Sequence, residues 1–224
     1  MANNPGERQQ LKNALTLIAN KYADWMKENQ SLLSLLGASE GHFDVMVKFM
    51  DEPSFISNYS LGQGAPPVGC HINGFFSTAI KPFEIYINRT RASPSTLIHE
   101  LMHLLTHETF NKNTSTRLNE GVTEYFTRKV QGAADADRYP QFLAPRRSYP
   151  TELSDVNAAR GFIKNVIVPQ LPAIRSQKIG LGRQRNPAFD PDPTGGVNTD
   201  DMMKRAYFKG EIAMINMLKQ FSTV

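Results

Sequence analysis

The residues best suited to chemistry in this chain form the segment His99-Glu100-Leu101-Met102-His103. On an α-helix, residues four positions apart project from one face, so the two imidazoles can bind a single metal ion. Glu100 would lie about 100° around the helix from His99, beside the ion rather than bound to it. That position suits a general base that takes a proton from water at the metal. The segment therefore predicts a hydrolytic zinc site.

A catalytic zinc ion usually has three protein ligands, so this pair of histidines lacks one. His107 continues the four-residue spacing, but it drifts about 80° around the helix from His99, and we interpret it as an ordinary polar residue. The longer His-Glu-x-x-His-x-x-Gly-x-x-His pattern also fails, because Thr106 and Thr109 occupy its Gly and third His positions. The third ligand is therefore expected elsewhere.

Two glutamates downstream can supply the missing ligand. Glu120 and Glu124 are four residues apart in a segment whose apolar residues recur at helical spacing. Neighbouring carboxylates on a buried face repel each other unless a cation lies between them. We expect Glu120 to bind the metal ion and Glu124 to accept the outer N–H of a ligand histidine. The alternative interpretation is a solvated acidic face.

These segments resemble the gluzincin metallopeptidases, the thermolysin and alanyl-aminopeptidase group. The resemblance is carried by the His-Glu-x-x-His segment and by Asn-Glu-Gly-Val-Thr-Glu at residues 119–124, which is similar to the family's Asn-Glu-x-x-Ser/Thr-Asp/Glu pattern. It implies one zinc ion bound by His99, His103 and Glu120, with Glu124 orienting His99 and Asn119 preceding the third ligand.

A third segment near the C-terminus, Arg205–Glu211, contains Tyr-Phe-Lys-Gly. The aminopeptidase branch has a similar Tyr-x-Lys-Gly, and this resemblance implies that Tyr207 donates its O–H to the oxyanion of the transition state. The alternative is that Tyr207 only packs an amphipathic helix. The branch also grips the substrate's amino terminus with a Gly-x-Met-Glu-Asn segment, and the comparable residues 68–76 lack that carboxylate. We therefore favour an endopeptidase.

The composition is that of a soluble globular protein, with 40% hydrophobic and 21% charged residues. The formal net charge of +4 comes without basic runs, so we expect no nucleic-acid partner. No apolar run approaches the length of a membrane span, and no signal peptide is evident, so we expect a cytoplasmic protein or one exported by a leaderless route. Cys70 is the only cysteine, which excludes an intrachain disulfide. The oligomeric state stays open.

The elements predict one compact domain over residues 1–224, with an N-terminal helix and sheet lobe to about residue 92 and a helical zinc lobe beyond it. Its expected fold is α+β and zincin-like, with a small, mostly antiparallel sheet on the zinc helix. Ser93 and Pro94 are a suitable N-cap and first residue for that helix. We expect helices at 7–36, 151–168 and 200–221, strands at 43–50, 68–76 and 83–88, and loops at 53–67 and 180–196.

In zincins the last strand before the zinc helix pairs with the substrate, so the resemblance implies that an exposed strand here binds an extended peptide. Its residues are Phe83, Glu84, Ile85, Tyr86, Ile87 and Asn88. We interpret the chain as a zinc metallopeptidase that cleaves a peptide or protein. A compact, leaderless peptidase with one cysteine is also compatible with a bacterial toxin or effector domain. Two alternatives are an aminopeptidase or other small-substrate zinc hydrolase, and a non-catalytic, metal-stabilised binding domain. The intact Glu100 argues against the latter.

Overall fold

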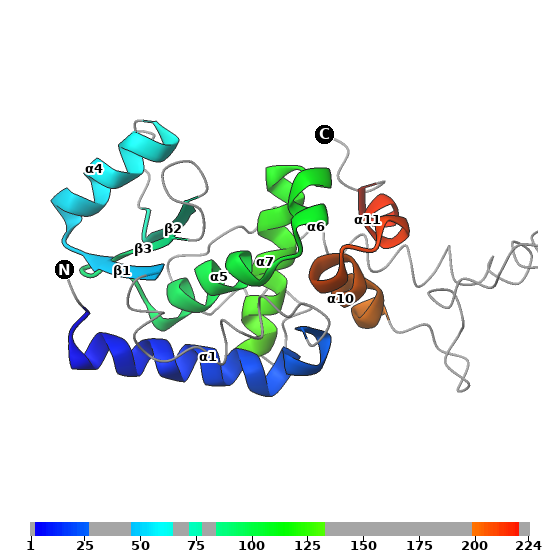
Figure 1. Ribbon diagram of the computed structural model, residues 1–224, viewed down its shortest axis with the longest axis horizontal. Coiled ribbons are helices and arrows are strands. Elements are labelled where there is room, and N and C mark those ends of the chain that lie inside the picture. Colours follow the sequence, from blue (N-terminus) through cyan, green and yellow to red (C-terminus); the bar gives the residue numbers. More distant parts are fainter. Residues whose placement is uncertain (1–2, 27–45, 65–71, 78–83, 133–198, 220–224) are drawn as a thin grey trace, which may run out of the picture. The chain divides into compact units, whose positions relative to one another are not determined.

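The computed structural model describes residues 3–26, 46–64, 72–77, 84–132 and 199–219 of the 224-residue chain. These residues form an α+β fold with a small mixed sheet and mainly helices (Figure 1). They divide into two compact units. The first contains the described residues up to Thr106 and those from Phe126 onward to 132, and the second contains His107–Tyr125 and the described C-terminal residues. The segment that carries His99 and His103 belongs to the first unit, together with the sheet.

The sheet of the first unit has the strand order β1-β3-β2, from β1 (Val47–Met50), β3 (Glu84–Asn88) and β2 (Gly74–Ser77). Strand β1 runs parallel to β3, and β2 runs antiparallel to it. The sheet is therefore mixed, not mostly antiparallel as predicted. The strand predicted last before the zinc helix is confirmed as β3, and it is the central strand.

A helix occupies most of the segment predicted as the loop 53–67. Helix α4 (Glu52–Gln63) begins at Asp51, whose side chain accepts a hydrogen bond from the Ser54 N–H at 2.9 Å. Pro53 lies in the first turn, where proline needs no amide hydrogen. Phe55 is buried and its ring lies 5.4 Å from that of Phe75 on β2. The prediction was wrong because Pro and Ser were interpreted as loop residues, although here they start a helix that one aromatic residue anchors.

The two faces of the sheet are covered by different helices (Figure 1). Helix α4 covers one face, where Phe55, Phe75 and Tyr86 form a cluster. Helix α5 (Pro94–Leu105) lies against β2 and β3, and helix α1 (Pro5–Met26) packs on α5. The predicted start of the zinc helix is confirmed, because the Ser93 side chain caps α5 in a reciprocal capping box with Thr96. Cover on both faces explains why all of β3 is buried.

A polar cluster lies on the sheet beside these aromatic rings. Lys48 Nζ donates to Glu84 Oε1 at 2.6 Å, and the Tyr86 hydroxyl donates to the other oxygen of that carboxylate. Burial, with this hydrogen bond, raises the pKa of Tyr86 to about 12. The phenol therefore keeps its proton well beyond neutral pH, and the cluster satisfies the buried Glu84.

One strand edge of the sheet is occupied by a side chain. The Asn3 amide donates from Nδ2 to the Val47 carbonyl at 2.8 Å and accepts from the Phe49 N–H at 3.5 Å. An amide side chain has the same donor and acceptor as a peptide group, so Asn3 takes the place of a neighbouring strand. The outer edge of β1 is therefore occupied at these two residues.

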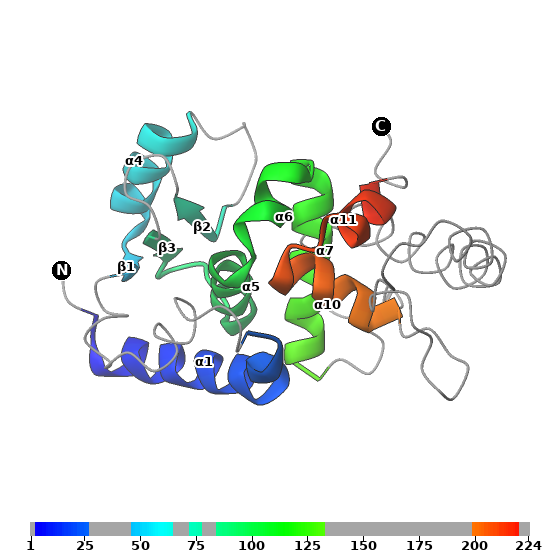
Figure 2. The ribbon, with the colours of Figure 1, turned by 45° about the vertical axis from the view of Figure 1, so that its right-hand side comes forward.

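The second unit is helical, with α6 (Glu108–Asn113), the first part of α7 (Thr116–Val130), α10 (Thr199–Lys209) and α11 (Ile212–Lys219). Helices α10 and α11 pack against α6 (Figure 2). The single helix predicted for 200–221 is interrupted at Gly210, which has a φ of 64° and donates its N–H to the Ala206 carbonyl. This left-handed C-cap ends α10, and α11 follows after Glu211.

Gly210 also leaves room for His107, the N-cap of α6. A Cβ at Gly210 would lie 2.2 Å from His107 Nδ1, and the His107 N–H donates to the Tyr207 carbonyl at 2.9 Å. We expect Gly210→Ala to lower the free energy of unfolding by about 2–4 kcal/mol, because backbone strain adds to this clash. Urea unfolding measures it. Gly132→Ala is the control, since Gly132 has a φ of 70° but nothing within 4 Å of its Cβ position. Equal losses in the two variants would contradict the steric argument.

Several predictions concern residues outside the described ranges. They are the helix 151–168, the loop 180–196, the continuation of the first helix beyond Met26, the early residues of the strands predicted at 43–50 and 68–76, and Phe83 and Cys70. Within the described residues, no helix combines the length and apolarity that crossing a membrane requires.

Candidate metal centre

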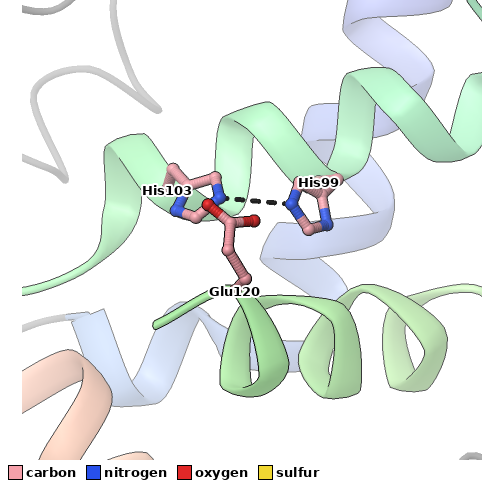
Figure 3. Close-up of side chains that lie close together, drawn as sticks. All are labelled: His99, His103 and Glu120. Atoms are coloured by element: carbon pink, nitrogen blue, oxygen red, sulfur yellow. Dashed lines mark hydrogen bonds between the residues drawn. The ribbon is translucent and has the colours of Figure 1, made fainter. Parts of the chain in front are cut away.

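Helix α5 places its two histidines one turn apart, with their rings close together and nearly perpendicular. The His99 and His103 Nε2 atoms are 3.1 Å apart, and the ring planes meet at 77°. His99 is buried and His103 is half-buried. Figure 3 shows the two rings projecting from the same side of the helix. Two ring nitrogens so close together can share one proton or one cation.

Glu120 on α7 is the third member of a group of residues that could hold a metal ion. One ligand atom from each of His99, His103 and Glu120 lies within 4.8 Å of the other two. Figure 3 shows the Glu120 carboxylate directed toward the two imidazoles. The structure therefore brings together the three residues predicted as metal ligands.

The three side chains fit a zinc ion in their chemistry, and the two imidazoles also fit it in their spacing. Two imidazoles and a carboxylate are a usual set of protein ligands for catalytic zinc. Nitrogen ligands about 2.0–2.1 Å from a tetrahedral ion lie roughly 3.3 Å from each other. The 3.1 Å between the two Nε2 atoms is close to that value. His99 and His103 are thus nearly pre-arranged for binding.

Glu100 lies on α5 beside the sheet and is not one of the three grouped ligands. Glu100 is buried. Its Oε1 lies 3.1 Å from the position that a Cβ atom would occupy on residue 74 of β2, which is a glycine. The Cγ of Glu100 and the Cγ2 of Thr96 are each 2.9 Å from the same point. Only a glycine allows β2 to come this close to Glu100.

Glu124 and Asn119 lie on α7, on either side of Glu120 in sequence. Glu124 is buried. Among the described residues the structure shows no hydrogen bond at the buried Nδ1 atom of His99, so the predicted bond from this ring to Glu124 is not formed there. Asn119 donates from Nδ2 to Asn111 Oδ1 on α6 at 2.7 Å. Asn119 therefore holds the start of α7 to α6 beside the third ligand.

Tyr207 lies in the second unit and is completely buried. Its ring meets those of Phe110 and Phe208 edge-on, with centroids 5.2 and 5.0 Å away. Its hydroxyl lies 2.9 Å from Thr123 Oγ1, one helical turn beyond Glu120 on α7. The structure thus places the phenol oxygen beside α7, and its role toward an oxyanion stays a prediction.

The prediction that strand 83–88 binds substrate along an open edge was wrong. Its described part, β3, pairs with β1 on one side and with β2 on the other. Its backbone N–H and C=O groups are therefore engaged in the hydrogen bonds of the sheet. The prediction carried over from the zincin resemblance the role of the last strand before the His99–His103 helix, but here that strand is central in the described sheet. Within the described residues, β2 is the outer strand that packs on α5.

Sequence reasoning missed Thr123 and Gly74. A signal for Thr123 was present, because Glu120, Thr123, Glu124 and Thr127 form a polar stripe at the helical spacings of three and four residues. Thr123 and Thr127 are fully buried in the structure. Gly74 carried no such signal, since its role depends on which strand lies over Glu100.

The family models, the curated proteins and the solved structures with which the chain was compared contain no match to it.

Proposed function

We propose that the protein is a zinc-dependent metallopeptidase, and that it acts as an endopeptidase. The convergence of the His99, His103 and Glu120 ligand atoms supports this proposal most directly. Glu100 next to the first ligand adds a candidate base that is not in the ligand group. A purely structural zinc site usually has four protein ligands and needs no adjacent carboxylate, so the three grouped residues of the described part of the chain and the separate Glu100 favour catalysis.

Each residue of the site has a separate role in the proposed hydrolysis of an amide bond. A zinc ion held by His99, His103 and Glu120 would supply Lewis acidity, which lowers the pKa of water and polarises a carbonyl. Glu100 takes the proton from the attacking water and delivers it to the leaving amine. Tyr207 donates a hydrogen bond to the oxyanion.

The position of β2 supports a peptide as the substrate. An extended peptide can add to a sheet edge through main-chain hydrogen bonds, and β2 is the outer strand beside Glu100. Asn3 occupies the outer edge of β1 at Val47 and Phe49, so β2 is the better candidate among the described strands. We therefore assign to β2 the role that the sequence had predicted for β3.

Zinc binding and peptide cleavage by the full chain test this proposal. Protein stripped of metal with a chelator should regain one zinc ion per chain and then cleave a library of amino-terminally blocked peptides. Faster cleavage of peptides with free amino termini would instead identify an aminopeptidase. Zinc uptake without any cleavage would favour a non-catalytic domain, and failure to bind zinc would exclude the proposal.

The close approach of β2 to Glu100 gives a further test. In Gly74→Ala, the new methyl group should displace the Glu100 side chain and lower kcat by about 10–100-fold, because general bases are sensitive to shifts near 1 Å. Zinc content should stay at one ion per chain. Gly6→Ala on α1 is the control, since its methyl would meet only the Asn4 side chain, at 3.3 Å. Unchanged kcat in Gly74→Ala would show that Glu100 tolerates the displacement.

A further inference from the structure

A chain of side-chain hydrogen bonds in the second unit ends at the Tyr207 hydroxyl. Asn119 Nδ2 donates to Asn111 Oδ1 at 2.7 Å. The side-chain oxygen of the same amide lies on the side of Thr123, one turn further along α7. Thr123 Oγ1 donates a hydrogen bond to that oxygen at 3.5 Å. The same Oγ1 lies 2.9 Å from the Tyr207 hydroxyl oxygen. The four residues come from α6, α7 and α10, and they link the neighbour of Glu120 to the phenol.

The Thr123 hydroxyl has one proton and lies within reach of both the Asn119 and the Tyr207 oxygens, so its direction affects the direction of the Tyr207 O–H. When Thr123 donates to Asn119, Tyr207 donates to Thr123. When Thr123 turns its proton to the phenol oxygen, the Tyr207 proton becomes available to another acceptor. The long 3.5 Å contact to Asn119 is a weak hydrogen bond, so little is lost in this rotation.

The residues around Tyr207 restrict movement of its ring and backbone, so rotation of its hydroxyl is the simplest change that it can make. Its ring is completely buried and contacts Phe110 and Phe208. Its backbone carbonyl accepts the His107 N–H at 2.9 Å. Thr123 is fully buried too, so its hydroxyl is not an exposed group hydrated at the surface.

We propose that Thr123 is a positioning residue for Tyr207, whose O–H it holds in the free protein and releases, by reversing its own hydrogen bond, when an oxyanion forms. This inference rests on the proposed peptidase function. Both rotations move hydrogen atoms about C–O bonds, and no proton changes its oxygen. A hydroxyl that donates to the phenol oxygen also strengthens the bond that the phenol donates in turn.

Kinetics of the zinc-loaded full chain test the role of Thr123. Thr123→Val keeps the shape of the side chain and removes its hydroxyl. It should lower kcat about 10-fold while changing KM less than about 2-fold, because the contact matters in the transition state. Thr123→Ser keeps the hydroxyl and should retain kcat within about 3-fold of the wild type.

A double-mutant cycle separates this role from a general effect on folding. Tyr207→Phe should itself lower kcat about 100-fold, as expected for an oxyanion donor. In that background Thr123→Val should change kcat less than about 2-fold, because the hydroxyl it serves is gone. Additive effects, or a Thr123→Ser variant as slow as Thr123→Val, would overturn the inference while an active wild type leaves the peptidase proposal standing. A wild type that neither binds zinc nor cleaves peptides would overturn both.

Discussion

Replacing Glu100 by glutamine should lower kcat about 1,000-fold, within the range that general-base catalysis contributes. Glutamine has nearly the same shape and cannot accept the proton of the attacking water. Because Glu100 is not one of the three grouped ligands, the variant should still bind one zinc ion per chain. Metal analysis and single-turnover cleavage of one peptide, measured on the same sample, therefore separate the chemistry from the binding of metal.

Glu108→Gln is the matched control for this prediction. Glu108 lies on α6 with 73% of its side chain exposed, and it pairs with Lys112 at 2.8 Å. The same chemical change there should leave kcat within about 2-fold, since exposed pairs contribute little. Full activity in Glu100→Gln would mean that another group is the base or that a contaminating protease is measured. Loss of zinc from this variant would make Glu100 a ligand.

Removing the third ligand should have the largest effect on metal binding. We expect Glu120→Ala to weaken zinc affinity at least about 1,000-fold, because loss of an outer partner alone costs about 10–100-fold. With zinc in large excess over both dissociation constants, such a loss removes about 4 kcal/mol of metal-linked stability. Competition with a chromophoric chelator gives the affinity, and thermal unfolding with and without zinc gives the stability.

Glu124→Gln completes a graded series for the metal site. Glu124 is buried on α7 and is not one of the three grouped ligands, so its loss should weaken affinity only about 10–100-fold. Glu108→Gln should leave it unchanged. An equal loss in Glu120→Ala and Glu124→Gln would show that the two carboxylates share the ion, and unchanged affinity in Glu120→Ala would remove residue 120 from the site.

The metal site was predictable from sequence because its geometry is local. The four-residue step fixes His99 and His103 on one face of α5, and the Ser93–Pro94 start of that helix follows from capping chemistry. The four-residue spacing of Glu120 and Glu124, with the resemblance of residues 119–124 to the gluzincin pattern, made Glu120 a candidate ligand. The spacing within each helix is local, whereas the combination of α5 and α7 residues in one ligand group came from the family resemblance.

The substrate strand and α4 were mispredicted because they depend on contacts between distant segments. β3 is central because it pairs with β1, which is distant in sequence, as well as with the neighbouring β2, and nothing local in the 84–88 segment distinguishes a central strand from an edge strand. Helix α4 depends on Phe55 meeting Phe75. The role of Gly74 depends on the same strand order, since it exists only because β2 lies over Glu100.

The Asn3 amide on β1 has a consequence for the solution behaviour of the protein. Exposed strand edges are templates on which identical molecules stack into aggregates, and proteins block them in various ways. Here a single side chain from outside the sheet fills two main-chain positions of β1, and it does so without adding a strand. The fold thereby protects the β1 border of the sheet, at Val47 and Phe49, against pairing with other copies of the chain.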